Sequence, residues 1–337
     1  MTSLTLALPE GEYKITIGQG LLSDTGKYFD LNRKCLIVTD DGVPEEYSTA
    51  VAKSCKDATV HTIKSGEASK NIDTLSEILK AMLEFQMTRK DAVIAVGGGV
   101  VGDISGLAAS LYMRGVDFYN VPTTLLSQLD SSIGGKTAID FMGVKNVVGA
   151  FYQPKGVLID TETLNTLDKR QYSAGMAEAI KMALTSNESL LSYIEENDIN
   201  ESNIETVITE SLKIKKAVVE EDERESGIRK ILNLGHTLGH GIEAATDGKL
   251  LHGECVAIGM IPVCEKEIRE RLYKLLKKFH LPTKSPVSID EAFSFVAHDK
   301  KADGNGISVI LVNKAGTHEI KKMTVSEFKN LVEENLK

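Results

Sequence analysis

The first 160 residues of this 337-residue chain alternate between short aliphatic runs and amphipathic ones, and this alternation restricts the fold more than any other feature. Four runs have the composition of buried strands: residues 34–39, 58–63, 91–96 and 117–121. Residues 74–87 and 104–113 carry apolar side chains at helical spacing, and Thr74 with Glu77 predicts a capping box in the first of these helices. Strands and helices that take turns predict a parallel sheet covered on both faces, in an α/β fold.

Three glycines follow the third predicted strand with G-x-G-x-x-G spacing, namely Gly97, Gly99 and Gly102. Such a loop lets a pyrophosphate approach backbone amides at a helix N-terminus, although glycines there often only form a tight turn. Ligands of parallel sheets bind beyond the carboxyl ends of the strands, where Asp40 and the pair Thr123–Thr124 also fall. The position therefore favours nucleotide binding over a plain turn.

After Asp160 the pattern changes to long helical stretches. The expected helices are residues 174–184, 204–219, 239–245, 253–269 and 270–279, before one more strand at 306–312. We expect two domains, an α/β domain at 1–160 and a mainly helical domain at 161–337.

Composition is that of an ordinary globular protein, with 42% hydrophobic and 26% charged residues. Because no apolar run reaches the roughly 20 residues that span a membrane, and the N-terminus does not resemble a signal peptide, we expect a cytoplasmic protein without a membrane partner. The net charge of −9 argues against binding nucleic acid through a general positive field. The four cysteines lack C-x-x-C spacing and are expected to be buried, reduced thiols: Cys35, Cys55, Cys255 and Cys264.

Three histidines fall within 17 residues in the second half of the chain, at His236, His240 and His252. The first two are four residues apart on one predicted helical face, and Glu243 adds an acid one turn further on. Histidine pairs with this spacing are often structural, but the third favours a metal site. The spacing leaves the ligands undecided.

Lysines near glycine turns form a second group. Lys136 ends the segment Asp130-Ser-Ser-Ile-Gly-Gly-Lys136, and Lys145–Asn146 precedes an apolar stretch. Surface lysines are usually only solvated, yet cations beside such turns suit an anionic ligand. Further cations occur near the other motifs and predict a substrate with phosphate and carboxylate groups: Lys181, Lys215, Arg229, Lys300 and Lys301.

In this order the motifs resemble the 3-dehydroquinate synthase family, from about Gly11 to Gly316. The resemblance is carried by Gly66-Glu-Ala-Ser-Lys70, Gly97-Gly-Gly-Val-Val-Gly-Asp103, Met113-Arg-Gly115, Pro122-Thr-Thr-Leu-Leu126, Asp130-Ser-Ser-Ile-Gly-Gly-Lys-Thr137, Lys145-Asn146, Met176-Ala-Glu-Ala-Ile-Lys181, Leu232-Asn-Leu-Gly-His-Thr-Leu-Gly-His240 and His252-Gly-Glu254. It implies an NAD-binding α/β domain, a helical metal-binding domain and an active site in the cleft between them.

The resemblance also implies the cofactor contacts. Zn²⁺, or Co²⁺ in its place, would be held by Glu178, His236 and His252, which moves His240 from ligand to active-site residue. The implied NAD contacts are Asp40, Glu67, Lys70, Gly98, Gly99, Val100, Asp103, Thr123, Thr124, Asp130, Lys145 and Thr166.

The family's substrate and catalytic residues are all present. They map onto Asp130, Lys136, Asn146, Lys181, Lys215, Glu225, Arg229, Asn233, His240 and Lys300. Arg114 would reach in from a partner subunit, which implies a homodimer. Two stretches depart from the family pattern: Thr137-Ala-Ile-Asp140 stands where many members have Thr-Gly-x-Asn, and Leu167-Asp168-Lys-Arg-Gln171 where Leu-Pro-x-Arg-Glu is usual.

The implied reaction cyclises a seven-carbon phosphorylated keto acid of the shikimate pathway, with NAD acting catalytically and phosphate eliminated. One alternative is another sugar phosphate cyclase with the same fold. A second is a metal-dependent polyol dehydrogenase, and a third is a catalytically inactive nucleotide-binding module. The lysine set, together with the histidine cluster, favours cyclisation of the seven-carbon keto acid over these three alternatives.

Overall fold

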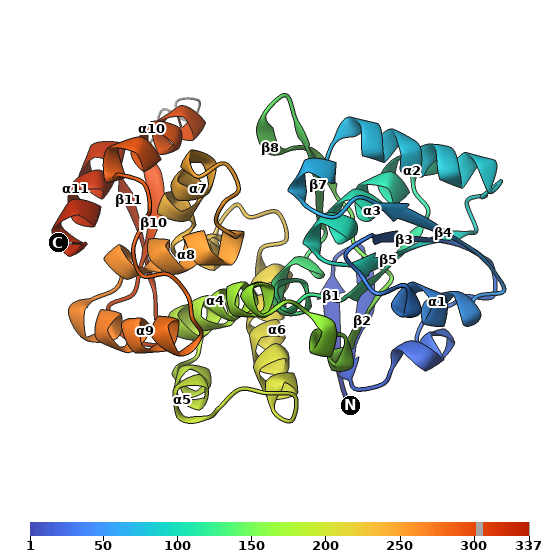
Figure 1. Ribbon diagram of the computed structural model, residues 1–337, viewed down its shortest axis with the longest axis horizontal. Coiled ribbons are helices and arrows are strands. Elements are labelled where there is room, and N and C mark those ends of the chain that lie inside the picture. Colours follow the sequence, from blue (N-terminus) through green and yellow to red (C-terminus); the bar gives the residue numbers. More distant parts are fainter. Residues whose placement is uncertain (301–305, 337) are drawn as a thin grey trace. The chain divides into compact units, whose positions relative to one another are not determined.

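The computed structural model describes residues 1–300 and 306–336, with side chains placed except at 297–300. It forms two compact units, Met1–Leu167 and a second that begins at Asp168. The first unit contains a seven-stranded sheet in the order β1-β2-β9-β6-β5-β3-β4 (Figure 1). Its strands are β1 (Thr2–Leu8), β2 (Gly11–Gly18), β3 (Lys34–Asp40), β4 (Asp57–Ile63), β5 (Ala92–Gly97), β6 (Asp117–Pro122) and β9 (Gly156–Asp160).

The sheet is parallel, as the sequence predicts, except that β1 pairs antiparallel with β2 at one edge. Alternate residues of β3 serve opposite faces. Leu36 belongs to a core with α2 (Ile72–Glu84) and α3 (Gly99–Leu111), whereas Ile37 packs with η1 (Leu22–Lys27) and α1 (Glu45–Lys53). Because both faces are buried, β5 and the middle of β3 are continuously apolar.

In the first unit, two helix starts differ from the prediction. The capping box at Thr74 and Glu77 is wrong: α2 begins at Ile72, and the side chain of Asn71 caps it by accepting a 2.9 Å hydrogen bond from Thr74 N. Helix α3 begins at Gly99, five residues before the predicted start, because the glycines themselves form its first turn. The other helical and hairpin elements of this unit are η2 (Glu67–Ser69), η3 (Tyr112–Arg114), η4 (Ser127–Ser131), η5 (Thr161–Thr166) and the hairpin β7 (Lys136–Phe141) with β8 (Val144–Phe151).

The described part of the second unit is mainly helical and contains a small hairpin (Figure 1). Its elements are α4 (Lys169–Ser186), α5 (Glu188–Glu196), α6 (Ile204–Glu221), η6 (Ile228–Asn233), α7 (His236–Ala245), α8 (His252–Met260), η7 (Ile261–Val263), α9 (Lys266–Lys278), α10 (Ile289–Lys300), β10 (Ile307–Leu311), β11 (Glu319–Met323) and α11 (Val325–Asn335). The single helix predicted at 253–269 is wrong. Pro262 lies in the short η7 turn that separates α8 from α9, because proline cannot continue the hydrogen-bond ladder.

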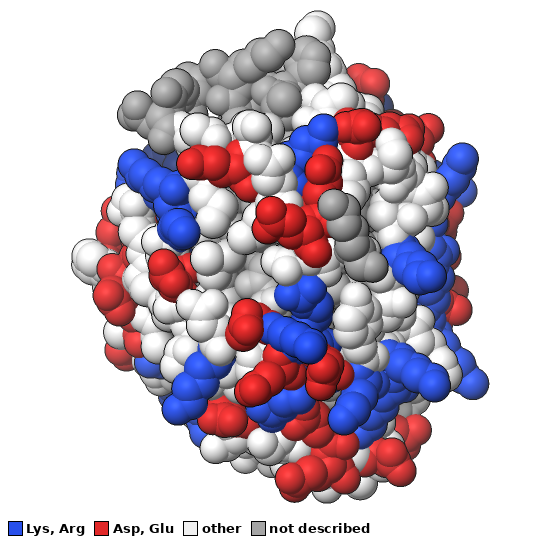
Figure 2. Space-filling view, turned by 90° about the vertical axis from the view of Figure 1, so that its left-hand side faces the viewer, with Lys and Arg blue, Asp and Glu red and all other residues white. Residues whose placement is uncertain are grey.

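All four cysteines are free thiols, but only three are buried, since Cys55 is half-buried. Within the described ranges, no helix is both long and apolar enough to cross a lipid bilayer. On the face seen in Figure 2, basic and acidic side chains are interspersed.

Candidate active site and metal centre

The structure brings the three clustered histidines together. His236 opens α7, His240 follows one turn later and His252 opens α8. One ring nitrogen of each lies within 4.8 Å of the corresponding atoms of the other two, and the ring centroids are 5.1–5.6 Å apart. This proximity is what a shared divalent cation requires.

Glu178 of α4 also faces this cluster. Its Oε1 lies 3.7 Å from His252 Nε2, and its side chain is 1% exposed. Lys181 forms an ion pair with its Oε2, yet neither carboxylate oxygen accepts a hydrogen bond of normal geometry from any side chain or amide that the structure describes. Lys181 offsets the charge at Oε2, but Oε1 faces His252 without such a contact, and a buried carboxylate oxygen left in this state is costly unless a cation approaches it. One carboxylate and two imidazoles therefore fit a divalent metal such as zinc.

Hydrogen bonds fix the proton positions of two of the rings. His236 Nδ1 lies 3.1 Å from the carbonyl oxygen of Leu234, and His252 Nδ1 lies 3.0 Å from Oε2 of Glu243. Because these oxygens accept, each Nδ1 must carry a proton, which leaves Nε2 of the neutral ring with a free lone pair. His240 is exposed. The bonds therefore suit His236 and His252 as metal ligands.

Charge and burial act differently on the two rings. Burial, with the nearby charges of Lys181 and the other two histidines, holds the pKa of His236 well below its usual value. Burial also lowers the pKa of His252, but the carboxylates of Glu243 and Glu178 outweigh it, and the net pKa is raised. A neutral His236 is the form that can bind a metal.

Predicted substrate residues of this unit are buried cations: Lys181 is 1% exposed, Lys215 5% and Arg229 2%. Burial of three cations in one unit is unusual unless they meet anionic groups. Nearby, Asn233 donates a hydrogen bond to Glu225, so these two predicted residues also lie together.

Sequence reasoning missed Asp222, which organises the loop before η6. Its carboxylate accepts hydrogen bonds from the backbone amides of Ser226, Gly227 and Arg229, at 2.7–3.0 Å. Burial raises its pKa, but the amides of Gly227, Arg229 and Ser226 outweigh this effect and lower the pKa to about 2. An aspartate among so many acids carries no sequence signal that sets it apart.

In the first unit the glycine loop joins β5 to α3. A Cβ atom added at Gly97 would lie 2.6 Å from Val101 Cγ2, and one at Gly98 would lie 3.0 Å from Thr124 Cγ2. Thr123 N donates a 2.9 Å hydrogen bond to Gly97 O. The first amides of a helix lack intrahelical acceptors, so Gly99 and its neighbours can bind an anion. The loop also lies where the strand order reverses between β3 and β5, the usual ligand site of such sheets.

Lys70 contacts residues that are predicted to bind the cofactor and one that is predicted to bind the substrate. Its Nζ lies 2.6 Å from Asp103 Oδ2 and 3.8 Å from Glu67 Oε1, and donates a 2.5 Å hydrogen bond to Asn146 Oδ1. Asp140 accepts a 2.8 Å bond from Asn146 N. An asparagine at this position could accept the same bond, so the departure at Asp140 preserves the contact.

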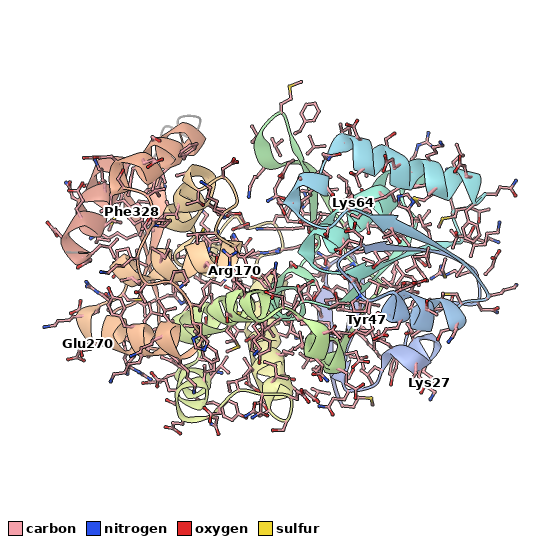
Figure 3. All side chains as sticks on the ribbon, viewed as in Figure 1. Lys27, Tyr47, Lys64, Arg170, Glu270 and Phe328 are labelled. Atoms are coloured by element: carbon pink, nitrogen blue, oxygen red, sulfur yellow. The ribbon has the colours of Figure 1, made fainter. Side chains whose placement is uncertain are left out.

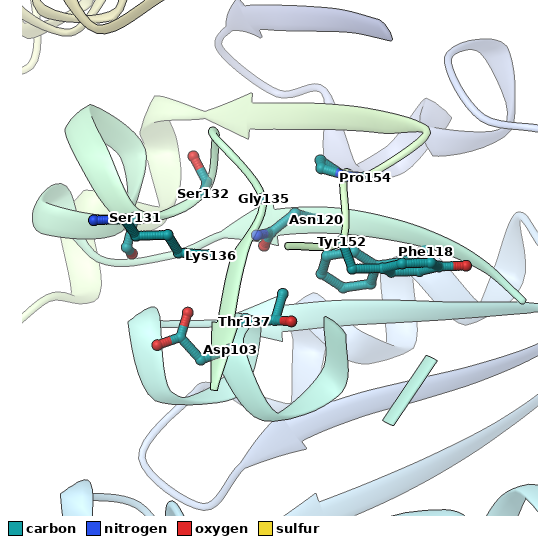
Figure 4. Close-up of a pocket in the computed structure, with 11 residues that line it drawn as sticks. Asp103, Phe118, Asn120, Ser131, Ser132, Gly135, Lys136, Thr137, Tyr152 and Pro154 are labelled. Carbon is teal, nitrogen blue, oxygen red and sulfur yellow. The ribbon is translucent and has the colours of Figure 1, made fainter. Parts of the chain in front are cut away.

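A hollow of about 210 Å³, including space open to solvent, adjoins the start of α3, and Asp103 and Lys136 border it (Figure 4). Its wall includes Asn120 Oδ1, Ser131 Oγ and Ser132 Oγ, which are buried and have no hydrogen-bond partner among the described residues. Such polar walls suit ordered water or a polar ligand group.

Strained backbone marks three predicted site residues. Non-glycine residues with positive φ include Arg114 at 67°, Asn146 at 54° and Glu225 at 60°. Such conformations cost about 1–3 kcal/mol each and cluster at functional sites. Arg114 is exposed.

The other predicted residues lie in separate elements. Asp40 ends β3, where burial raises the pKa of its carboxyl despite hydrogen bonds from Gly42 and Val43. Thr166 Oγ1 lies 2.8 Å from Tyr47 Oη, which Figure 3 labels. The remaining ones lie in defined elements: Val100 in α3, Asp130 in η4, Lys145 in β8. Lys300 ends α10, but its side chain and all of Lys301 lie outside the described residues.

Known proteins are similar to this chain along nearly its whole length. Relatives named 3-dehydroquinate synthase include one from Streptococcus suis, 40% identical over 96% of this chain and 98% of that protein, and one from Clostridium acetobutylicum, 41% identical over 97% and 98%. Similar solved structures include 2-deoxy-scyllo-inosose synthase complexed with carbaglucose-6-phosphate, NAD⁺ and Co²⁺, with a TM-score of 0.90 and 26% identity over 99% of this chain and 100% of that one. Another is 2-epi-5-epi-valiolone synthase from Streptomyces hygroscopicus subsp. jinggangensis with NAD⁺ and Zn²⁺ bound, with a TM-score of 0.88 and 28% identity over 98% of both chains.

Two family models divide the chain between them. The model described as 3-dehydroquinate synthase N-terminal matches residues 60–174, and the one described as 3-dehydroquinate synthase C-terminal matches residues 175–302. Together the two models cover residues 60–302, and the relatives named above cover nearly the full chain. The chain belongs to the 3-dehydroquinate synthase family.

Proposed function

We propose that this protein is a 3-dehydroquinate synthase that converts 3-deoxy-D-arabino-heptulosonate 7-phosphate to 3-dehydroquinate and phosphate in the shikimate pathway. It would use NAD catalytically, with Zn²⁺ or Co²⁺ as its metal. The observation that carries the proposal is the buried Glu178 carboxylate, which accepts no normal hydrogen bond within the described part of the chain and faces both Lys181 and the histidine cluster. A carboxylate, imidazoles and a buried ammonium together suit proton transfer at a metal-bound oxygen compound.

Glu178, His236 and His252 would hold the metal. When bound, the metal and NAD supply polarisation of the reacting hydroxyl and reversible hydride transfer. Exposed His240 would hold or move the hydroxyl proton, since its ring lies 5.4 Å from that of His236. The ammonium of Lys181 would favour the deprotonated oxygen at the same place.

The first unit would bind NAD. The helix N-terminus at Gly98, Gly99 and Val100 suits the pyrophosphate. The other proposed contacts are Asp40, Glu67, Lys70, Asp103, Thr123, Thr124, Asp130, Lys145 and Thr166.

Cations would bind the phosphate and carboxylate of the substrate, because bidentate and charge-assisted hydrogen bonds suit these groups. Arg114 would contribute from the partner of a homodimer, and its exposure fits this role. The other proposed substrate residues are Asp130, Lys136, Asn146, Lys181, Lys215, Glu225, Arg229, Asn233 and Lys300. We place the enzyme in the cytoplasm, where free thiols such as Cys55 are usual.

The second candidate is another sugar phosphate cyclase, favoured by the similarity to 2-deoxy-scyllo-inosose synthase. Incubation of the purified enzyme with NAD, Zn²⁺ and either 3-deoxy-D-arabino-heptulosonate 7-phosphate or glucose 6-phosphate separates the two. We expect proton NMR to detect 3-dehydroquinate from the first sugar phosphate and no carbocycle from the second. A carbocycle formed only from glucose 6-phosphate would establish the second candidate instead.

A further inference from the structure

We propose that Glu243 is a positioning residue that sets the affinity of the histidine cluster for its divalent cation. The inference rests on the proposed function, since it takes Glu178, His236 and His252 as the ligands. Glu243 lies in the last turn of α7, and its side chain is 13% exposed. It would act through His252 rather than on the metal or the substrate.

The hydrogen bond between the two residues determines which way the ring of His252 faces. Oε2 of Glu243 lies 3.0 Å from Nδ1 of His252, a normal hydrogen-bond length. On the opposite side of the ring, Nε2 lies 3.7 Å from Oε1 of Glu178. The ring therefore lies between two carboxylates, with its Nδ1–H toward Glu243 and its Nε2 toward Glu178.

Removal of the Glu243 carboxylate would release two constraints. The proton of His252 could then move to Nε2, and that tautomer cannot bind a metal through Nε2. The ring could also rotate, because its Nδ1 would have lost this acceptor. A carboxylate partner additionally makes the imidazole a stronger ligand, and loss of such partners typically weakens metal binding about 10- to 100-fold.

His236 provides an internal comparison. Its Nδ1 donates to the main-chain carbonyl of Leu234, which no side-chain substitution removes. A single side-chain substitution can therefore release the ring of His252 but not the ring of His236. Glu243 is also placed differently from Glu254, which hydrogen-bonds the backbone amide of Leu251 rather than a histidine ring.

The test measures metal affinity in three variants of the full chain. Apoenzyme of the wild type, E243A, E243Q and D247N is titrated with Zn²⁺ against a chromophoric chelator, and with Co²⁺ by its visible absorption. Asp247 is exposed and lies just beyond the end of α7, so D247N removes the same charge close by without removing the bond. Nitrogen NMR of labelled histidine in the apoenzymes reports the tautomer of His252, and thermal unfolding reports their stability.

We expect E243A to raise the Kd for both metals about 10- to 100-fold, and to shift His252 from the Nδ1–H form to a mixture of tautomers. E243Q should lose less affinity, since its amide oxygen can still accept the proton of Nδ1. D247N should match the wild type. An unchanged Kd in a folded E243A, or an equal loss of affinity in D247N, would overturn the inference.

A fourth variant separates this inference from the ligand assignment. If H252A binds zinc as tightly as the wild type, the proposed ligand set is wrong. If H252A loses zinc while E243A and E243Q retain wild-type affinity, the ligand set stands and only the role of Glu243 is refuted.

Discussion

Arg170 donates two parallel hydrogen bonds of 2.7 Å to Glu254, from Nε to Oε1 and from Nη2 to Oε2. The pair joins the start of α4, which carries Glu178, to the start of α8, which opens with His252. The helices approach so closely that a Cβ atom at Gly253 would lie 2.0 Å from the carbonyl oxygen of Ala174. The Arg170–Glu254 pair therefore links the helix that carries Glu178 to the helix that opens with His252, two candidate metal ligands.

Replacement of Arg170 by lysine should destabilise the second unit. A lysine cannot form the two paired hydrogen bonds. The Glu254 carboxylate, whose side chain is only 10% exposed, would then lose part of the interaction that offsets the cost of its burial. Because Arg170 itself is half-exposed, we expect a loss of only about 1 kcal/mol in the free energy of unfolding. Urea denaturation of R170K beside K169A, a change at the exposed neighbouring lysine, provides the measurement. Equal stability of the two variants would show that the pair contributes nothing.

The two interpretations of the histidine cluster make opposite predictions for His240. If Glu178, His236 and His252 bind the metal, H240N should keep a full complement of zinc but turn over about 10²-fold more slowly, as expected for loss of a positioned proton-transfer group. H236A should lose both zinc and activity. Metal analysis of the purified variants distinguishes the interpretations, because a metal-free H240N would instead make His240 a ligand.

The lowered pKa of Asp222 predicts a specific acid sensitivity. A carboxylate with a folded-state pKa of about 2, below its unfolded value, stabilises the fold above pH 4, and this contribution disappears as the pH falls toward 2. The free energy of unfolding should therefore fall more steeply between pH 4 and pH 2 in the wild type than in D222N. Asp41, whose pKa is also about 2, is the same in both proteins and cancels. Urea titrations that give parallel curves would contradict the role of Asp222.

Subunit mixing tests whether Arg114 acts on the partner's site. R114A and K181A should each be inactive as homodimers. In a mixed dimer, the subunit with Lys181 intact would receive Arg114 from its partner, so random mixing should restore about a quarter of wild-type activity. If Arg114 serves its own subunit, or if the enzyme is monomeric, co-refolded R114A and K181A would show no gain over the separate variants.

Much of the sheet follows from sequence because strands such as β3 and β5 are buried on both faces and have a continuous apolar run, as at residues 35–38. The hairpin at 136–151 could not be found in this way, since β8 is exposed along most of its length and shows no alternation. The cap of α2 was misplaced because Thr74 and Glu77 also satisfy the capping pattern. Only the structure shows that Asn71 makes the bond.

Part of the candidate site could likewise be predicted from the sequence, and part could not. Local spacing predicts that His236 and His240 lie on one helical face, and they do. Spacing alone could not identify Glu178, which is 58 positions before His236 in the numbering, or the hydrogen bond from His252 to Glu243. These relationships depend on how α4, α7 and α8 pack, and packing of distant helices leaves no periodic signal in a single sequence.

The central claim is that hydride leaves and returns within one catalytic cycle. It is tested most directly by following phosphate release and NADH absorbance in the same cuvette, with the heptulosonate phosphate in large excess over NAD. A 3-dehydroquinate synthase should release many phosphates for each NAD present while free NADH stays near zero. Accumulation of NADH in proportion to substrate consumed, without release of phosphate, would contradict the account and indicate a metal-dependent dehydrogenase.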